Sequence, residues 1–390
     1  MANAQYKGMP KIFTLKDCIN TALKNNPEVL LSGARIDAAN ADIKGAFGQY
    51  LPNLSVNGGY SRHLNPSDSI NASYGGVSMK FANPSSPNSY NMNANLGWTI
   101  FDGFSRGEYY SQAQDRFRSA NLDADYIDNK IVRDVYRSFI DVVKKKKILE
   151  ARAENMKLGE KELERIKAQK EAGIISIGAV YSQEADLGNK EFELINAENE
   201  FNVSKALLLT VMGMNPNASA DFSDLGLLTE VSDVDVLRFR NSISEYSRAI
   251  DFALDNRDDF KSTQYSIQAA QSGISAARSG YFPRVSSYMS WGWNNSQLTE
   301  FDQGRSFLGL SFSLPVFDQF QTNTRIQNAT LQLRQAEIQQ FQLEQSIRSS
   351  VQAAYLNLES VEKQLDITAR SLKASERNFE SAKERFKVGS

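Results

Sequence analysis

The chain of 390 residues contains the same series of motifs twice, and this internal repeat restricts its possible folds more than any other feature. Repeats of this kind show that one structural unit has been used more than once. Two motifs and one glycine occur in both halves: Tyr50-Leu51-Pro52 and Tyr281-Phe282-Pro283, Ile100-Phe101-Asp102 and Val316-Phe317-Asp318, and Gly173 and Gly389. We therefore expect two copies of one arrangement within a single chain.

Between the second motif and the glycine, apolar residues recur at steps of three and four in both halves. The first copy has Ala113, Phe117, Ala120, Ala124, Ile127, Ile131, Val135, Phe139 and Val142. The second copy has Ala329, Leu333, Ala336, Gln340, Leu343, Ile347, Val351, Tyr355 and Leu358. Only Gln340 is not apolar. This spacing predicts one apolar stripe along a helix in each copy.

The first of these helices is predicted to be very long. No proline interrupts the stripe from about residue 105 to residue 172, so the helix would extend about 100 Å. Helices of this length act as coiled coils or spacers. Gly173 is a natural helix stop, Ser176 can cap the next helix, and a second helical pattern covers residues 177–212. We predict an antiparallel helical hairpin with an exposed tip.

A different pattern, with a period of two, precedes each long helix. From Tyr90 to Ile100, apolar residues alternate with Asn, Gly and Thr, and the second copy repeats this around Trp291, Trp293 and residues 308–316. Strict alternation predicts strands with one apolar face. We expect lipid-facing side chains at Tyr90, Met92, Leu96, Trp98, Trp291, Trp293, Leu310 and Phe312, and pore-lining side chains at Asn91, Asn93, Asn95, Thr99, Ser311 and Ser313.

These strands are long enough to cross a bilayer at a tilt. Two pairs of strands in one chain cannot close a barrel. An open sheet in lipid would leave unpaired N–H and C=O groups along both edges, at a cost of several kcal/mol for each group. The sequence therefore predicts that the sheet closes with other chains into a pore, which the long helices continue as a tunnel.

Composition excludes several classes of function. The net charge of −2 shows no basic excess, so a nucleic-acid partner is not expected. A single cysteine and a single histidine exclude an internal disulfide and a histidine-rich metal site. We expect Cys18 to be buried rather than lipid-modified, and His63 to be a surface or pore-lining group. No phosphate-binding loop or nucleophile motif is present, so we predict no enzyme, cofactor or metal.

Neither a membrane-spanning helix nor a signal peptide is visible. No run of about 18 apolar residues occurs, and residues 1–10 have no apolar core. If the protein is exported, we expect its leader to be absent from this chain.

The order of these motifs resembles the TolC-type outer-membrane factors of Gram-negative bacteria, the outer membrane efflux protein family. The resemblance covers about residues 15–389. It is carried first by the duplicated Tyr-x-Pro and by the strand–helix junctions at Phe101-Asp102 and Phe317-Asp318. The tip motif Arg385–Gly389 and the end of the second hairpin helix, Ala206–Gly213, also carry it.

The resemblance implies an α+β membrane protein that forms a homotrimer. Each chain would give four strands to a twelve-stranded transmembrane β-barrel in outer-membrane lipid, and its helical hairpins would form an α-barrel through the periplasm. The duct would be a passive exit for efflux or secretion, and its tips would recruit a periplasmic adaptor and an inner-membrane transporter. By position, the tip residues are Ala172, Gly173, Ile174, Ile175, Ser176, Val388 and Gly389.

The repeats, together with the resemblance, imply the following division. Residues 1–240 form the first repeat, with strands at about 53–64 and 90–101, a helical hairpin at about 104–213 and an equatorial connector at 214–240. Residues 241–390 form the second, with helices at 241–281, strands at about 284–295 and 306–317, and a long helix at 320–388. By analogy with the first copy, we expect it to stop before its second hairpin helix.

We also expect loops at residues 65–89 and 221–224. The alternative interpretation of the whole chain is a long-helix structural or filament-type assembly protein without a membrane barrel. A periplasmic adaptor is disfavoured, because it usually has one helical hairpin rather than two in tandem.

Overall fold

The computed structural model describes residues 11–62, 64, 69–74, 77–82, 87–223, 233–243, 245–298 and 304–387. His63, predicted to be a surface or pore-lining group, and Val388 and Gly389, predicted to be tip residues, lie outside these ranges. Two compact units are present, and each combines segments from both sequence copies. Unit 1 comprises Met1–Asp37, Ala120–Ser262 and Gln342–Ser390, and unit 2 comprises Ala38–Ser119 and Thr263–Phe341.

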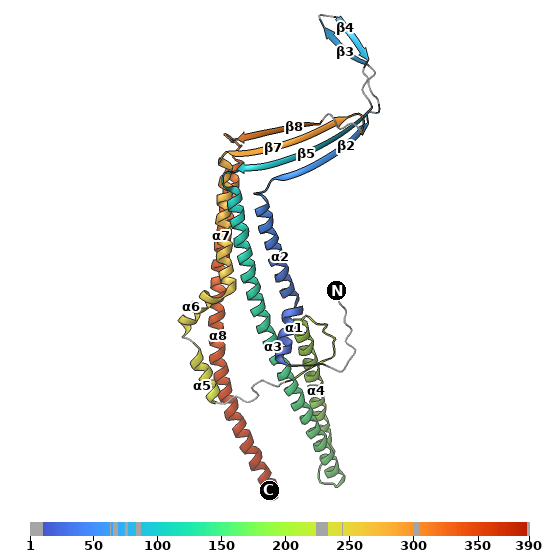
Figure 1. Cartoon of the computed structure of the whole chain (residues 1–390). Coiled ribbons are helices and arrows are strands. Elements are labelled where there is room, and N and C mark those ends of the chain that lie inside the picture. Colours follow the sequence, from blue (N-terminus) through green and yellow to red (C-terminus); the bar gives the residue numbers. More distant parts are fainter. Residues whose placement is uncertain are drawn as a thin grey trace. The chain divides into compact units, whose positions relative to one another are not determined.

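Unit 2 contains a four-stranded antiparallel sheet (Figure 1). Its strands are β2 (Asn53–Arg62), β5 (Asn88–Phe101), β7 (Arg284–Asn295) and β8 (Arg305–Ser313), in the order β2-β5-β7-β8. The central pair, β5 and β7, joins the first sequence copy to the second. The short helix η1 (Ser279–Tyr281) directly precedes β7.

Two further strands lie in the segment that was predicted to be a loop. β3 (Ser69–Tyr74) and β4 (Val77–Ala82) pair with each other as an antiparallel ribbon, so the loop prediction for residues 65–89 was wrong there. The Asn-, Ser- and Pro-rich composition suggested a loop. Gly75-Gly76, a pair typical of hairpin turns, was the sequence signal for the ribbon.

The long helices contribute residues to both units. They are α2 (Pro27–Gly48), α3 (Ser105–Glu171), α7 (Asp258–Arg278) and α8 (Gln321–Lys387). Helices α3 and α8 each have 67 residues, and each begins shortly after the Phe-Asp motif of its own copy. Two matching positions of the stripe are buried in both copies: Ala113 and Ala329, and Ile131 and Ile347. Among the described residues, no helix has the length and hydropathy needed to span a membrane.

Unit 1 has a hydrophobic core built from the start, the middle and the end of the first copy. Its other elements are β1 (Lys11–Phe13), α1 (Leu15–Asn25), α4 (Ile177–Val211), β6 (Ala220–Phe222), α5 (Asp233–Ser242) and α6 (Tyr246–Asn256). The core includes Phe13, Cys18, Val135, Phe139, Val142, Leu208, Leu209, Met212 and Phe222. Cys18 is fully buried, as expected, and burial raises the pKa of its thiol to about 12.

The predicted loop at residues 221–224 is partly a strand. β6 pairs in parallel with β1, which places Phe222 opposite Phe13, and their rings lie 6.1 Å apart. The pairing partner is about two hundred residues away in sequence. Three residues carry too little local pattern to predict such a pair.

Candidate functional site

The register of the sheet places most of the apolar residues of its four strands on one face. Leu54 lies opposite Leu96, Leu96 opposite Met289, and Met289 opposite Leu308, so a single row crosses all four strands. The residues predicted to face lipid lie on this face. They are Tyr90, Met92, Leu96, Trp98, Trp291, Trp293, Leu310 and Phe312.

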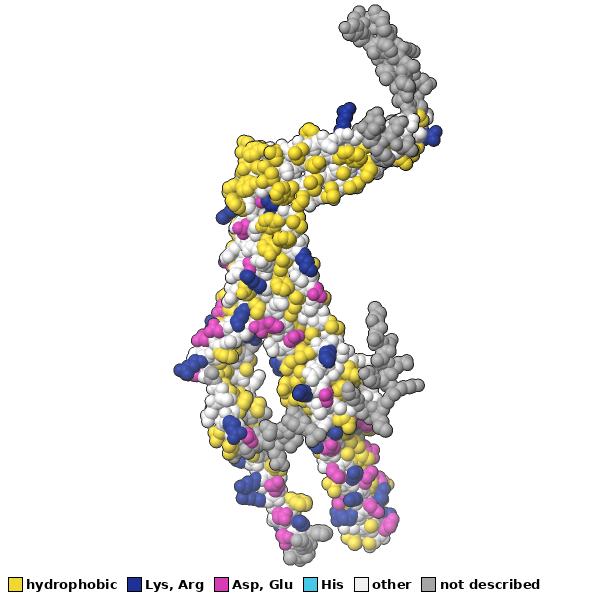
Figure 2. Space-filling view, in the orientation of Figure 1, with side chains coloured by type: hydrophobic (Ala, Val, Ile, Leu, Met, Phe, Trp, Pro, Cys, Tyr) yellow, Lys and Arg dark blue, Asp and Glu magenta, His cyan; other side chains and the backbone are white. Residues whose placement is uncertain are grey.

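Most of this apolar face is uncovered in the single chain. Leu310 and Phe312 are 73% and 69% exposed, and Trp98 is 47% exposed. Figure 2 shows hydrophobic side chains spread over the sheet. Large continuous apolar surfaces mark contacts with proteins or membranes. Trp293 is the exception on this face, because it is only 3% exposed and offers little surface for such a contact.

The opposite face is mainly polar, although the rings of Tyr288 and Phe307 lie on it. Another row runs from Asn57 through Asn93 and Gly292 to Arg305, and the other predicted pore-lining residues share this face. They are Asn91, Asn95, Thr99, Ser311 and Ser313. We name the two sides of the sheet the apolar face and the polar face. Their separation is what a sheet between lipid and water requires.

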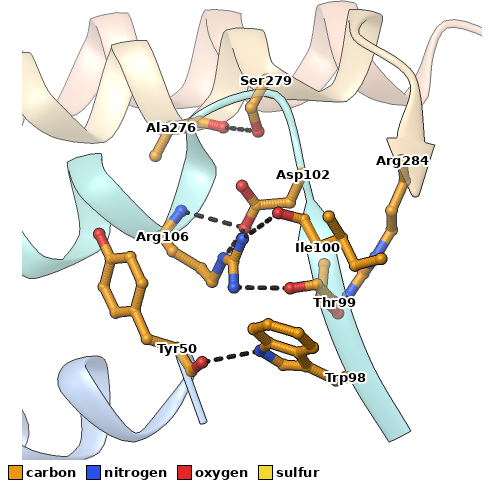
Figure 3. A network of polar contacts seen from close by, with 9 residues as sticks. All are labelled: Tyr50, Trp98, Thr99, Ile100, Asp102, Arg106, Ala276, Ser279 and Arg284. Carbon is orange, nitrogen blue, oxygen red and sulfur yellow. Dashed lines mark hydrogen bonds and ion pairs between the residues drawn. The ribbon is translucent and has the colours of Figure 1, made fainter. Parts of the chain in front are cut away.

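At the end of β5, a network of hydrogen bonds ties the strand to the start of α3 (Figure 3). The Asp102 carboxylate accepts from the Arg106 backbone N–H at 3.2 Å and from Arg106 Nε at 3.0 Å. The Arg106 guanidinium also donates to the carbonyls of Thr99 and Ile100, at 2.8 and 3.0 Å. One arginine thus satisfies the last acceptors of the strand while Asp102 caps the helix.

The Tyr-x-Pro motif is part of the same junction. Trp98 Nε1 donates to the carbonyl of Tyr50 at 3.0 Å, and the Arg106 guanidinium lies 5.1 Å from the centre of the Tyr50 ring. The motif therefore holds the end of α2 against β5 and α3. The repeats in the sequence pointed to Tyr50 and Asp102 but not to Arg106. An acid four residues before an arginine at a helix start was the available signal.

The two copies of the junction share an unusual backbone conformation. Gly103 and Phe104 have φ values of 68° and 69°, and Gln319 and Phe320 in the second copy have 55° and 63°. Positive φ is uncommon for residues other than glycine. In the second copy, Asp318 Oδ2 accepts from the Thr322 backbone N–H at 2.7 Å, which repeats the cap.

A cavity of about 850 Å³ lies beside this junction, within unit 2. Its lining includes polar-face residues, such as Thr99, Ser286 and Ser313, and residues from α2, α3, α7 and α8. Three arginines and one acid also line it: Arg106, Arg284, Arg325 and Asp102. The three arginines could not be grouped from the sequence, because nothing in their local pattern links segments so far apart.

The predicted tip of the first hairpin is a tight, exposed turn between α3 and α4. Gly173 has a φ of 77°, the Gly173 N–H donates to Lys170 O, and the Ile174 N–H donates to Gln169 O. These are the two bonds of a glycine-terminated helix end. Ile174 is 70% exposed. Ser176 occupies the N-cap position of α4, but its side chain makes no capping hydrogen bond.

The outer membrane efflux protein family matches residues 18–214 and 249–390. Protein CyaE of Bordetella pertussis is 22% identical over 348 residues, covering 88% of this chain and 69% of that protein. Outer membrane protein TolC of Vibrio cholerae is 22% identical over 382 residues, covering 95% and 78%.

The structure of the CmeC outer membrane channel of Campylobacter jejuni has a TM-score of 0.78 and 17% identity to this chain. The match covers 100% of this chain and 82% of that one. It confirms the predicted combination of long helices and strands. The chain therefore belongs to the outer membrane efflux protein family, and it is an outer-membrane channel component for efflux or secretion.

Proposed function

We propose that three copies of this chain assemble into one duct in the outer membrane of a Gram-negative bacterium. Each copy contributes β2, β5, β7 and β8 to a twelve-stranded barrel, and the long helices extend into the periplasm. The observation that carries the proposal is the separation of the apolar and polar faces across one register. The duct itself is passive, and an inner-membrane transporter supplies the energy.

The edges of the sheet support assembly over insertion of a single chain. In the described sheet, β2 and β8 each have one strand neighbour and therefore one unpaired side. Unpaired backbone groups are costly in lipid, so an edge of one copy would pair with an edge of the next. Closure would turn the apolar face to lipid and the polar face to water.

A matched pair of substitutions on β8 tests this arrangement. Leu310→Arg puts a charge on the exposed apolar face, and Ser311→Arg puts the same charge on the polar face. An arginine facing lipid costs about 2–4 kcal/mol near the bilayer midplane, whereas one facing the lumen costs little. We expect Leu310→Arg to abolish most of the heat-resistant trimer in lipid vesicles and Ser311→Arg to leave it intact.

The filament-type alternative predicts a different result. Both variants would then behave alike, and the wild-type protein would stay in buffer without detergent. Either finding would contradict the proposed barrel.

We also propose that the hairpin tips recruit a periplasmic adaptor. Supporting this, Gly173 has no atom within 4 Å of the place where a Cβ would stand, and Ile174 is exposed. A turn of this kind allows a partner helix to approach the backbone closely. The proposed contact residues are Ala172, Gly173, Ile174, Ile175 and Ser176, and by analogy Val388 and Gly389.

A further inference from the structure

The polar face of the sheet carries an uneven charge. Among its described strand residues, two side chains are charged, and both are arginines: Arg284 at the start of β7 and Arg305 at the start of β8. None of the described polar-face residues of β2, β5, β7 and β8 is an acid. The remaining side chains there are mainly Asn, Ser, Gly and Thr, which are neutral. The face is therefore electropositive.

Arg284 lies at the end of the sheet that adjoins the helices. It is exposed and pairs in register with Ser313, and its Nη2 donates to Thr99 Oγ1 at 3.3 Å. Within the described part of the chain, no ion pair joins it to an acid. Its positive charge is therefore available to a solute on the polar side.

The other charges around the cavity do not cancel Arg284. Asp102 is engaged by Arg106, in a pair whose side chains are both 13% exposed. The positive charge of Arg325 is partly offset by the negative charge of Asp318. Hydrogen bonds from Thr322 lower the pKa of Asp318, and the Arg325 charge lowers it further. Two of the three arginines thus have an acidic neighbour, and Arg284 is left as the excess charge.

Arg305 adds a second positive charge at the opposite end of the strand pair. Glu300 and Asp302 precede it closely in sequence, and both lie outside the described residues. The inference therefore rests on Arg284.

We propose that Arg284 makes the duct anion-selective at the helix end of the barrel. The inference rests on the proposed trimeric duct, because closure would repeat Arg284 three times around one lumen. Rings of charged side chains set ion selectivity in channels, and arginine rings favour anions. The preferred cargo would carry carboxylate or phosphate groups, for which the guanidinium offers charge and paired N–H donors.

The test is the reversal potential of purified trimers in a planar lipid bilayer under a KCl gradient. We expect the wild-type channel to prefer chloride. Arg284→Gln should lower the chloride-to-potassium permeability ratio by roughly threefold at low salt, and Arg284→Glu should lower it further, because charge effects of this kind are screened as ionic strength rises. Citrate, a tricarboxylate, should partly block the wild-type current and block Arg284→Gln less.

Arg62→Gln is the matched control, because Arg62 ends β2 on the apolar face by the same alternation. It removes an exposed arginine from the side proposed to face lipid, so selectivity should not change. Unchanged selectivity and citrate block in both Arg284 variants, with conductance retained, would overturn the inference. Absence of any channel from the wild-type protein would instead refute the proposed function.

Discussion

At the scale of single residues, Gly103 shows why one copy of the junction needs a glycine. Its φ is +68°, and a Cβ there would stand 2.6 Å from Phe282 Cβ and 2.9 Å from Ser279 O. Gly103→Ala should therefore lower the free energy of unfolding by about 2–4 kcal/mol, from backbone strain and overpacking together. Urea unfolding in detergent, followed by circular dichroism, measures the change.

The second copy provides the control. Gln319 holds a φ of 55° with a side chain in place. Gln319→Gly relieves that strain but gives the unfolded chain more freedom, so its net effect should be below about 1 kcal/mol. Equal effects of the two substitutions on the free energy of unfolding would show that the close contacts of Gly103 do not contribute to stability.

At the scale of elements, the two long helices begin with the same cap but different support. The Asp102 carboxylate caps α3 and also binds the Arg106 side chain. The Asp318 carboxylate caps α8 by accepting a hydrogen bond from the Thr322 backbone N–H. Asp102→Ala should cost about 2–3 kcal/mol, because it removes a cap and leaves a mostly buried guanidinium without its carboxylate. Asp318→Ala should cost about 1 kcal/mol, the usual value for a cap.

The same unfolding measurement compares these two variants. A cost for Asp102→Ala no larger than that for Asp318→Ala would mean that the Arg106 network of Figure 3 adds nothing to stability.

At the scale of the whole assembly, the exposed tip predicts a contact that can be mapped in cells. A photo-crosslinking amino acid at Ile174 should form a crosslink to a periplasmic adaptor, identified by mass spectrometry. The same amino acid at Phe252 of α6, which is 68% exposed, should not. Ile174→Glu should abolish the adaptor crosslink from a neighbouring tip position without lowering the amount of trimer, since surface substitutions usually change stability by less than about 0.5 kcal/mol.

An assembled trimer that forms no adaptor crosslink from Ile174 would argue against recruitment through this tip. Equal crosslinking of the adaptor from Ile174 and Phe252 would show that the adaptor does not contact the tip specifically.

Much of the architecture could be predicted from periodicity alone. The long stripe predicted α3 and α8, and the alternation around Trp98 and Leu310 predicted strands with two distinct faces. These features are local. Helical geometry repeats every 3.6 residues and strand geometry every two, so each pattern can be recognised within a short stretch of sequence. The duplication reinforced it, because each copy supported the interpretation of the other.

By itself, the sequence determined the helices, the main strands, their two faces and the resemblance to outer-membrane channels. Only the tertiary structure decided which distant segments meet. It paired β1 with β6, joined the copies through β5 and β7, and brought Arg106, Arg284 and Arg325 around one cavity. Such contacts join segments that are far apart in the sequence. A periodic pattern among neighbouring residues contains no information about which distant segments pair.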